Sequence, residues 1–295
     1  MINKIMNQMK KAIQSLSVML VLLAVVTSGC NDDNDNSFPE KDGKLLVTKT
    51  EFKASYVDEE VGSKLPIGKH DLFEMKYNEQ GELTEYRLND ECIGRFTYTE
   101  GKIFVQDDPV FGSCVHFLSP EGKVVETVYA DENRDKDKLT YNEKGQCVSL
   151  DYHNGETMLF QWENDQVTGI GYRNLTPTPS CRIYYTDIPQ KSNAPYLRNL
   201  MMSYCGYYDY LEISGHIDIS SDKYLPAKVI IEFDGGGKEG YAQIFEATYD
   251  LNPDETVKTM HLTAHDGILS SPEEHRLVYK GDVTFAYATK TDRKS

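Results

Sequence analysis

The chain has 295 residues, of which 47 are acidic and 31 are basic, and its net charge is −16 at pH 7. Such a surface repels phosphate backbones and anionic lipid headgroups, which disfavours nucleic-acid binding as a function. Apolar residues make up 39% of the sequence, and a chain of this length can bury the core of one large domain or of two smaller ones.

The first 29 residues have the layout of a targeting peptide. They contain three lysines and no acidic residue, and the apolar run Val18–Val26 precedes the small residues that lead to Cys30. Nine apolar residues rise only about 14 Å as a helix, which is about half of a bilayer core. The segment Thr27–Cys30 resembles the acylation site of bacterial lipoproteins; the alternative is an ordinary secretory peptide with a chance cysteine near its cleavage site. We therefore expect cleavage after residue 29, an acyl chain such as palmitate on Cys30, and a mature net charge of −19.

An acidic, flexible tether is predicted over residues 30–42. Asp32, Asp33 and Asp35 follow the cysteine in a run that can bury no apolar surface. A cysteine followed by an acidic cluster also resembles the export signal that sends Bacteroidetes lipoproteins to the outer leaflet of the outer membrane. A calcium loop is excluded, because the glycine and glutamate that it needs are absent at the required spacing. A flexible tether of this length holds a domain about 20 Å from the membrane.

A hairpin pattern recurs between residues 45 and 185 with a period near twenty residues. Each copy has an aromatic residue, a polar turn and a residue that tolerates a positive φ, as in a type I turn that opens the next strand. The turn residues follow one another at steps of 20, 21, 23 and 20: Gly81, Gly101, Gly122, Gly145 and Asp165. The aromatic residues before them are Tyr77, Tyr98, Phe117, Tyr141 and Trp162.

The segments between these turns alternate as strands require. Leu150 and Tyr152 are predicted on one face of a strand and Cys147 on the other. Return turns are predicted at Asn89–Asp90 and at Asn154–Gly155, where the Asn-Gly pair favours a type I′ turn. A helical repeat is excluded, because no 3.6-residue periodicity is present.

Residues 186–225 break the pattern and are predicted as a crossover with a short helical turn over 196–204. Strands resume over 227–233, 241–249, 257–263 and 283–288, with a polar loop over 266–274. The predicted fold is all-β, an antiparallel up-and-down meander of about 12–16 strands that forms an open curved sheet or a partial barrel. It is expected to be one domain over 43–290, with hairpin repeats over 45–185, the crossover over 186–225 and closing strands over 226–290.

A family resemblance rests on several of these features together. They are the cysteine with its acidic tether, the aromatic-turn-Gly hairpins, and the stretches Asp209–Leu211 and Tyr224–Val229 before a closing hairpin. Together they resemble uncharacterised surface lipoproteins of Bacteroidales that carry a porin-like β-meander domain of unknown function. The resemblance covers most of residues 45–290. It implies an outer-membrane, lipid-anchored and surface-exposed protein, and it brings no catalytic residues.

Five cysteines remain beyond the anchor, and export permits disulfides between them. An odd number leaves at least one thiol free or paired between chains, and the connectivity stays open. Their spacings match no zinc pattern, and most are expected to be buried as small hydrophobic residues. They are Cys92, Cys114, Cys147, Cys181 and Cys205.

The other candidates for chemistry are weak, and neither a catalytic residue nor a metal or other cofactor is predicted. His261 and His265 are about 13 Å apart on a strand, too far to share one ion. Cys114 and His116 share a strand face about 7 Å apart, too far for direct activation of the thiolate. The segments Asp250–Glu255 and Asp234–Lys238 fail the calcium-loop and phosphate-loop patterns and are predicted as hairpin turns.

Tyr207, Tyr208 and Tyr210 are the predicted ligand-binding residues, because amphipathic aromatic side chains stack on sugar rings and anchor interfaces. The alternative is that Tyr208 and Tyr210, two residues apart, only cover one open end of the sheet.

Three functions compete at this point. The first is a non-enzymatic, surface-tethered β protein that binds a glycan, a peptide or a partner protein. The second is a structural subunit that pairs its open sheet edges with another outer-membrane protein. The third is a hydrolase whose acidic residues converge from distant parts of the sequence, which a cleft with two close carboxylates would support.

Overall fold

The computed structural model describes ten stretches of the chain, all within the second of two compact units, Met1–Asn36 and Ser37–Ser295. They are residues 40–41, 44–56, 70–108, 112–131, 136–173, 179–200, 209–219, 223–233, 240–268 and 275–288. The predicted targeting peptide, Cys30 and the acidic residues Asp32, Asp33 and Asp35 lie outside the described residues.

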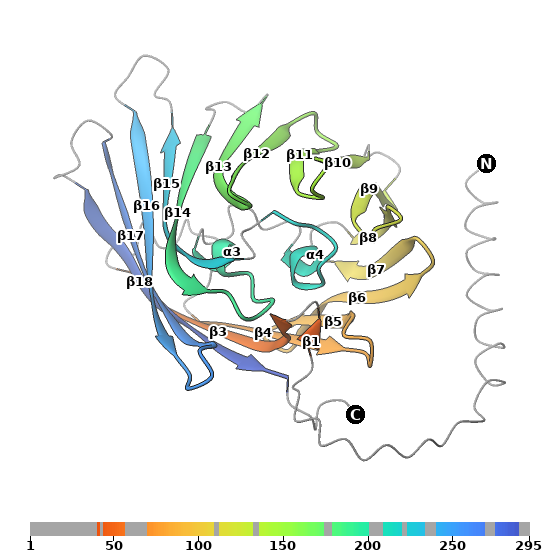
Figure 1. Cartoon of the computed structure of the whole chain (residues 1–295), viewed down its shortest axis with the longest axis horizontal. Coiled ribbons are helices and arrows are strands. Elements are labelled where there is room, and N and C mark those ends of the chain that lie inside the picture. Colours follow the sequence, from red (N-terminus) through yellow and green to blue (C-terminus); the bar gives the residue numbers. More distant parts are fainter. Residues whose placement is uncertain are drawn as a thin grey trace. The chain divides into compact units, whose positions relative to one another are not determined.

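Sixteen antiparallel strands form a closed barrel in the order of the chain (Figure 1). Each strand pairs with the one before and the one after it, which confirms the predicted all-β meander. The strands are β3 (Val47–Tyr56), β4 (His70–Tyr77), β5 (Leu83–Leu88), β6 (Glu91–Thr99), β7 (Lys102–Asp108), β8 (Gly112–Leu118), β9 (Val124–Tyr129), β10 (Asp137–Tyr141), β11 (Cys147–Asp151), β12 (Thr157–Glu163), β13 (Gln166–Arg173), β14 (Pro179–Pro189), β15 (Tyr224–Phe233), β16 (Tyr241–Leu251), β17 (Val257–Ile268) and β18 (Arg276–Tyr287).

The closure corrects the prediction of an open sheet or a partial barrel. The last strand, β18, pairs with β3 at nine positions, from Tyr279↔Tyr56 to Tyr287↔Val47. The weakest seam lies elsewhere, between β9 and β10, which share only the pairs Asp137↔Thr127 and Lys138↔Glu126. The polar loop predicted over 266–274 is also corrected at its start, because β17 continues to Ile268.

The repeated turns all lie at one end of the barrel, here called the repeat end, because every second connection of a meander returns to the same side. Their last residues have the positive φ that the sequence predicts, from 62° to 79°: Gly81, Gly101, Gly122, Gly145 and Asp165. In the last of these turns Asn164 also has a positive φ, of 52°, so this turn is of type I′ and not of the predicted type I. The other connections lie at the far end. There the predicted turn at Asn89–Asp90 has positive φ at both residues. In the turn between β11 and β12 only Gly155 has positive φ, so the predicted type I′ turn at Asn154–Gly155 is wrong.

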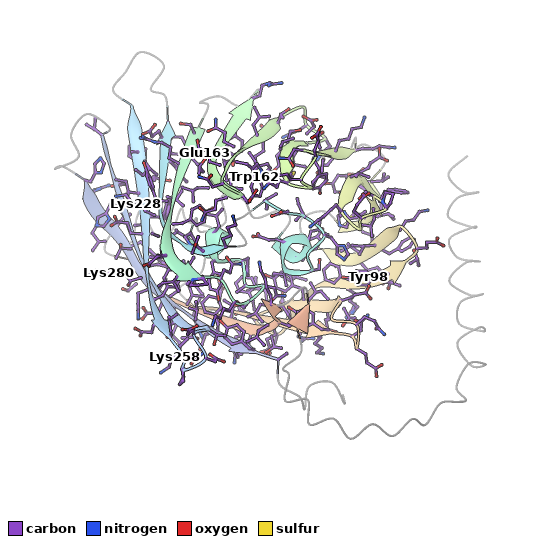
Figure 2. The ribbon with its side chains drawn as sticks, in the orientation of Figure 1. Tyr98, Trp162, Glu163, Lys228, Lys258 and Lys280 are labelled. Carbon is purple, nitrogen blue, oxygen red and sulfur yellow. The ribbon has the colours of Figure 1, made fainter. Side chains whose placement is uncertain are left out.

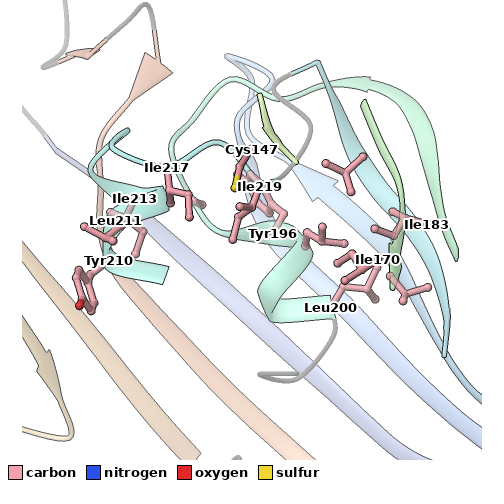
Figure 3. Close-up of a cluster of buried hydrophobic side chains, with 14 of the residues drawn as sticks. Cys147, Ile170, Ile183, Tyr196, Leu200, Tyr210, Leu211, Ile213, Ile217 and Ile219 are labelled. Carbon is pink, nitrogen blue, oxygen red and sulfur yellow. The ribbon is translucent and has the colours of Figure 1, made fainter. Parts of the chain in front are cut away.

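The described parts of the crossover between β14 and β15 lie inside the barrel, where Figure 1 shows two short helices, α3 (Tyr196–Leu200) and α4 (Asp209–Ile213). We call residues 190–200 and 209–219 the plug. Its apolar side chains meet the inner faces of the strands in one buried cluster (Figure 3). The largest fully buried residues of the plug are Tyr196, Leu200, Leu211 and Ile213. The barrel lumen is therefore the hydrophobic core of the protein.

Backbone hydrogen bonds hold the plug to the repeat end. The N–H of Val124 donates to the carbonyl of His216, and that of Cys147 donates to the carbonyl of Asp218, at 2.9 and 3.1 Å. The side chain of Asn193 accepts a hydrogen bond from the backbone N–H of Val47 at 2.7 Å. The plug is thus hydrogen-bonded to the first residues of β3, β9 and β11.

The chain enters the barrel at the same end. A small hairpin, β1 (Glu40–Lys41) with β2 (Lys44–Leu45), precedes β3. The N–H of Leu45 donates to the carbonyl of Lys191 at 3.1 Å, and the N–H of Asn193 donates back to Leu45 at 3.0 Å. The segment just before β3 is therefore fixed against the plug.

The outer face of the barrel is charged. Lys53 on β3 lies opposite Asp282 on β18, and their side chains are 62% and 60% exposed. Lys228 on β15 pairs with Glu246 on β16 at 3.0 Å. Figure 2 labels Lys228 together with two further outer lysines, one on β17 and one on β18. The strands thus alternate between apolar residues facing the lumen and charged residues facing solvent.

A belt of aromatic side chains ties neighbouring strands together near the repeat end. Each donates its O–H or N–H to the backbone carbonyl of a residue at the start of the preceding strand, at 2.5–2.9 Å. We call these seven residues the aromatic belt, and Figure 2 labels two of them, Tyr98 and Trp162. The pairs are Tyr77 to Val47, Tyr98 to Leu83, Tyr141 to Val124, Trp162 to Cys147, Tyr185 to Val167, Tyr249 to Pro226 and Tyr287 to Val257. Four of the five aromatic residues of the sequence repeat, all except Phe117, are thus hydrogen-bond donors to the preceding strand.

Candidate functional site

Of the three tyrosines predicted to bind a ligand, the structure describes only Tyr210. Tyr207 and Tyr208 lie outside the described residues, and Tyr210 is buried in α4 with 4% of its surface exposed. Its ring packs on Phe96 with 5.0 Å between centroids. Tyr210 is therefore part of the core and not of an exposed surface, because α4 lies inside the barrel.

Tyr210 instead joins a buried polar cluster on β8 and β9. The Nε2 atom of His116 lies 3.0 Å from the Tyr210 hydroxyl, and its Nδ1 atom lies 2.8 Å from the Thr127 hydroxyl. The Sγ atom of Cys114 lies 3.7 Å from His116 Nε2, so the predicted separation of about 7 Å is wrong. The side chains lean toward each other, although their Cα atoms are two residues apart.

This cluster holds the plug to β8 and β9 through hydrogen bonds. His116 is completely buried, and this burial lowers its pKa to about 3, so the imidazole is neutral at physiological pH. A neutral imidazole does not draw a thiol into its thiolate form by charge. The hydrogen bonds of His116 satisfy polar groups that would be costly to bury alone.

A second cluster lies at the far end of the barrel, around the buried carboxylate of Asp137. One carboxylate oxygen accepts hydrogen bonds from the backbone N–H of His153 at 2.6 Å and lies 3.0 Å from its Nδ1 atom. The other oxygen accepts a hydrogen bond from the hydroxyl of Tyr129. Asp137 is 0% exposed, whereas a quarter of the His153 side chain is exposed. The carboxylate thus fixes the orientation of an imidazole that reaches solvent.

A third cluster lies at the same end, on β15 to β18. Asp266 accepts a hydrogen bond from Arg276 Nε at 3.0 Å on one oxygen and from the Tyr241 hydroxyl at 2.7 Å on the other. The ring of Phe233 lies beside that of Tyr241, with 6.0 Å between centroids. The Arg276 side chain is 62% exposed and Tyr241 is one of the most exposed aromatic residues described, at 36%.

These two clusters, here called the mouth clusters, are the best candidate site on the described part of the chain. Asp137 begins β10 and Asp266 lies near the end of β17, so both clusters occupy the far end of the barrel. Each combines an ordered carboxylate with an aromatic ring and a cationic or imidazole group near solvent. Such a combination can hydrogen-bond and stack on a ligand. Neither cluster, as described, brings two carboxylates together for acid–base hydrolysis.

The candidates that the sequence analysis rejected form local hydrogen bonds where the structure describes them. His261 lies on the outer wall between Asp282 at 2.7 Å and Asp250 at 3.1 Å, and these hydrogen bonds raise its pKa. Among the described residues no group of three His, Cys, Asp or Glu side chains could hold a metal ion. The turn over 252–256 is closed by the side chains of Asn252 and Asp254, which both bond Thr256, while the predicted loop Asp234–Lys238 lies outside the described residues.

The described cysteines are free thiols. Burial raises the pKa of Cys147 and of Cys181 to about 12, so both thiols are inert at neutral pH. Cys114 is also buried, Cys92 is partly exposed, and Cys205 lies outside the described residues. The inward position of Cys147 corrects its predicted face. A register shift at Thr140 and Tyr141, opposite this residue, displaces the alternation by one position.

Comparisons with known proteins identify the fold. No protein-family model matches the sequence, and no curated protein matches it. A porin-like protein from Bacteroides uniformis has 15% sequence identity and a TM-score of 0.58, over 82% of this chain and 97% of that one. A porin-like protein from Bacteroides vulgatus has 12% identity and a TM-score of 0.51, over 83% of this chain and 99% of that one. The expected porin-like β domain is thus confirmed at the level of fold. Within the described residues, no helix has the length and apolar character needed to span a bilayer.

Proposed function

We propose that this protein is a lipid-anchored, non-catalytic binding protein of the bacterial outer surface, in which the barrel is a scaffold and not a pore. The anchor would be the acyl chain on Cys30, and the acidic residues Asp32, Asp33 and Asp35 would direct export to the surface. The observation that carries the proposal is the polarity of the barrel, which has an apolar, filled lumen and a charged outer wall.

A pore-forming barrel has the opposite polarity, with a polar interior and an apolar band toward the lipid. Here Lys53 and Asp282 lie outward on paired strands, away from the strand ends. A lysine on the lipid face costs about 2–4 kcal/mol at the bilayer midplane, so a wall with many such residues is expected to stay in water. The plug residues Leu211 and Ile213 are each 1% exposed, which supports a lumen that is not a channel.

The mouth clusters support the binding role. In these clusters Tyr241, Arg276 and His153 lie near solvent and are held by hydrogen bonds to buried carboxylates. Side chains that are ordered in this way lose little entropy when a ligand binds. A glycan, a peptide or a protein partner would each use such groups. The earlier alternative of a structural subunit that pairs through open sheet edges loses its basis, because the closed barrel has no free edge among β3 to β18.

Two experiments test the proposal. The wild-type protein is expected to incorporate labelled palmitate and to fractionate with membranes, whereas Cys30→Ser protein is expected to stay soluble. Reconstituted lipoprotein is expected to give no conductance across a planar bilayer. Membrane association without palmitate would contradict the anchor, and single-channel currents would contradict the closed lumen.

The binding role is tested with soluble Cys30→Ser protein on glycan, peptide and surface-protein arrays. A ligand of the mouth clusters is expected to bind Arg276→Ala protein more weakly, while the outward variant Lys280→Ala binds it as the parent does. Failure of all three arrays to give a ligand would count against a binding function, and equal binding to both variants would move the site elsewhere.

A further inference from the structure

The position of the chain entry fixes one end of the barrel relative to any lipid anchor that precedes it. Leu45 is bonded in both directions to the plug, and the N–H of Ala288, just after β18, donates to the carbonyl of Leu46 at 2.8 Å. Both contacts lie at the repeat end, where β3 starts and β18 finishes. The tether therefore leaves the folded domain from the repeat end.

The tether is short compared with the barrel. Ten residue steps separate Cys30 from Glu40, where the hairpin of β1 and β2 begins. Fully extended they span at most about 35 Å, and as a flexible chain about 20 Å. A strand such as β17, with 12 residues, extends about 40 Å and rises about 30 Å when tilted as barrel strands are. The far end could therefore reach the membrane only if the tether ran the full height of the wall, which requires it to be almost fully extended.

We infer that the barrel stands end-on, with the repeat end toward the membrane and the far end, which carries the mouth clusters, directed outward. This inference rests on the lipid anchor of the proposed function. Arg276 and His153, at the far end, would then face away from the bilayer.

The charge of the repeat end agrees with this arrangement. The turns that form it, over 78–82, 100–101, 119–123, 142–146, 164–165 and 252–256, contain eight acidic residues and two lysines. Lys191 and Lys223, from the segment between β14 and β15, pair with two of these acidic residues, Glu255 and Asp165, so the turns keep an acidic excess. Anionic headgroups would repel such a surface across about a Debye length of 10 Å. The repeat end is therefore expected to face the membrane without adhering to it, held at the distance that the tether allows.

Energy transfer from the protein to the membrane tests the orientation. Glu100→Cys and Glu91→Cys form a matched pair, because both glutamates are exposed and they lie at opposite ends of β6. Each is introduced into Cys92→Ser lipoprotein, which removes the partly exposed thiol, and is labelled with a donor dye in vesicles that contain an acceptor lipid. The Cys92→Ser parent measures background labelling.

The two labels are about 30 Å apart along the strand, so transfer from the Glu100→Cys protein should exceed that from the Glu91→Cys protein by roughly two-fold or more. Insertion of a long Gly/Ser linker between Asp35 and Asn36 should reduce the difference, since a longer chain lets the barrel reorient. Equal transfer, or stronger transfer from the Glu91→Cys protein, would overturn the inference. Vesicle flotation separates the two proposals. If the lipoprotein does not float with vesicles, as the Cys30→Ser protein is expected not to, the anchor itself is refuted and the orientation with it.

Discussion

Raising the pH above 10 is expected to unfold the barrel in one step, because five tyrosines must keep their protons in the folded state. Burial of the hydroxyl groups raises the pKa of each of these residues above its ordinary value of 10. Each hydroxyl also donates a hydrogen bond to a backbone carbonyl, which a tyrosinate could not do. The five are Tyr77, Tyr98, Tyr141, Tyr249 and Tyr287.

The sign and size of the effect follow from proton linkage. Above pH 10 the unfolded chain releases these protons and the folded barrel keeps them, so the unfolded state binds fewer protons and stability falls as the pH rises. Between pH 10 and 11 the tyrosines of the unfolded chain go from about half to about nine-tenths ionised, so each tyrosine that keeps its proton in the folded barrel lowers the stability by about 1 kcal/mol, and the five together by about 5 kcal/mol. Well above pH 11 the limiting slope is about 1.4 kcal/mol per pH unit for each such group. The sum over this first pH unit is comparable with the whole stability of a marginal domain, about 5–15 kcal/mol for ordinary ones. Below about pH 9 these groups give almost no pH dependence.

The measurement is a parallel titration of tyrosinate absorbance and far-ultraviolet circular dichroism. Both signals should change together in one cooperative transition. Tyr141→Phe protein serves as the matched control, because it lacks one of the five groups and should show a shallower loss of stability with pH. Gradual ionisation of these tyrosines while the strand signal persists would refute the reasoning, since the hydroxyl groups would then be accessible in the folded barrel.

Three further results are expected. In urea unfolding, Leu211→Ala in the plug should lower the free energy of unfolding by about 2–5 kcal/mol. Lys258→Ala on the outer wall should change it by less than about 0.5 kcal/mol. If the two variants lost the same amount of stability, the plug would not be part of the core. Tyr98→Phe should cost about 1 kcal/mol, because the carbonyl that accepts its hydroxyl loses a donor, and unchanged stability would remove the aromatic belt as a source of stability. Asp282→Asn should lower the pKa of His261, whose strongest hydrogen bond it weakens, and an unaltered NMR titration of that imidazole would contradict the contact.

The hairpins could be predicted from sequence because their determinants are local. A positive φ at Gly81 or Gly145 depends on that residue and its immediate neighbours, and the structure has it there. Asp165 in the place of glycine also adopts it, with φ of 62°. The hydrogen bonds of the aromatic residues were not predicted, because the acceptor of Tyr77 is 30 residues away, at Val47.

Barrel closure and the plug could not be predicted for the opposite reason. Pairing of β18 with β3 joins residues more than 200 positions apart, and no turn chemistry marks it. The crossover over 186–225 was recognised as a break in the pattern, and α3 begins at Tyr196 as expected. Its burial follows only once the strands enclose a lumen too wide for their own side chains to fill.

The candidate site could not be predicted either, because it also depends on contacts between residues that are distant in the sequence. Tyr210 was selected for its residue type, yet its hydroxyl is committed to His116, which lies 94 positions earlier in the chain. Asp137 and Asp266 carried no sequence signal, since they are two among 47 acidic residues. Their burial is what distinguishes them, and burial depends on which strand face each residue occupies after the barrel has closed.

The seam between β9 and β10 has a mechanical consequence. Those two strands are covalently consecutive yet share two residue pairs, whereas β18 and β3, at opposite ends of the chain, share nine. The chain is thus continuous between β9 and β10, where the pairing is weakest, and the pairing is extensive between β18 and β3, which no loop connects. A circular permutant could join the native termini and begin the chain between β9 and β10 instead. Only two residue pairs would then hold these strands together. The barrel of such a protein should open there first, and the amide hydrogens of β9 and β10 should exchange before those of the other strands.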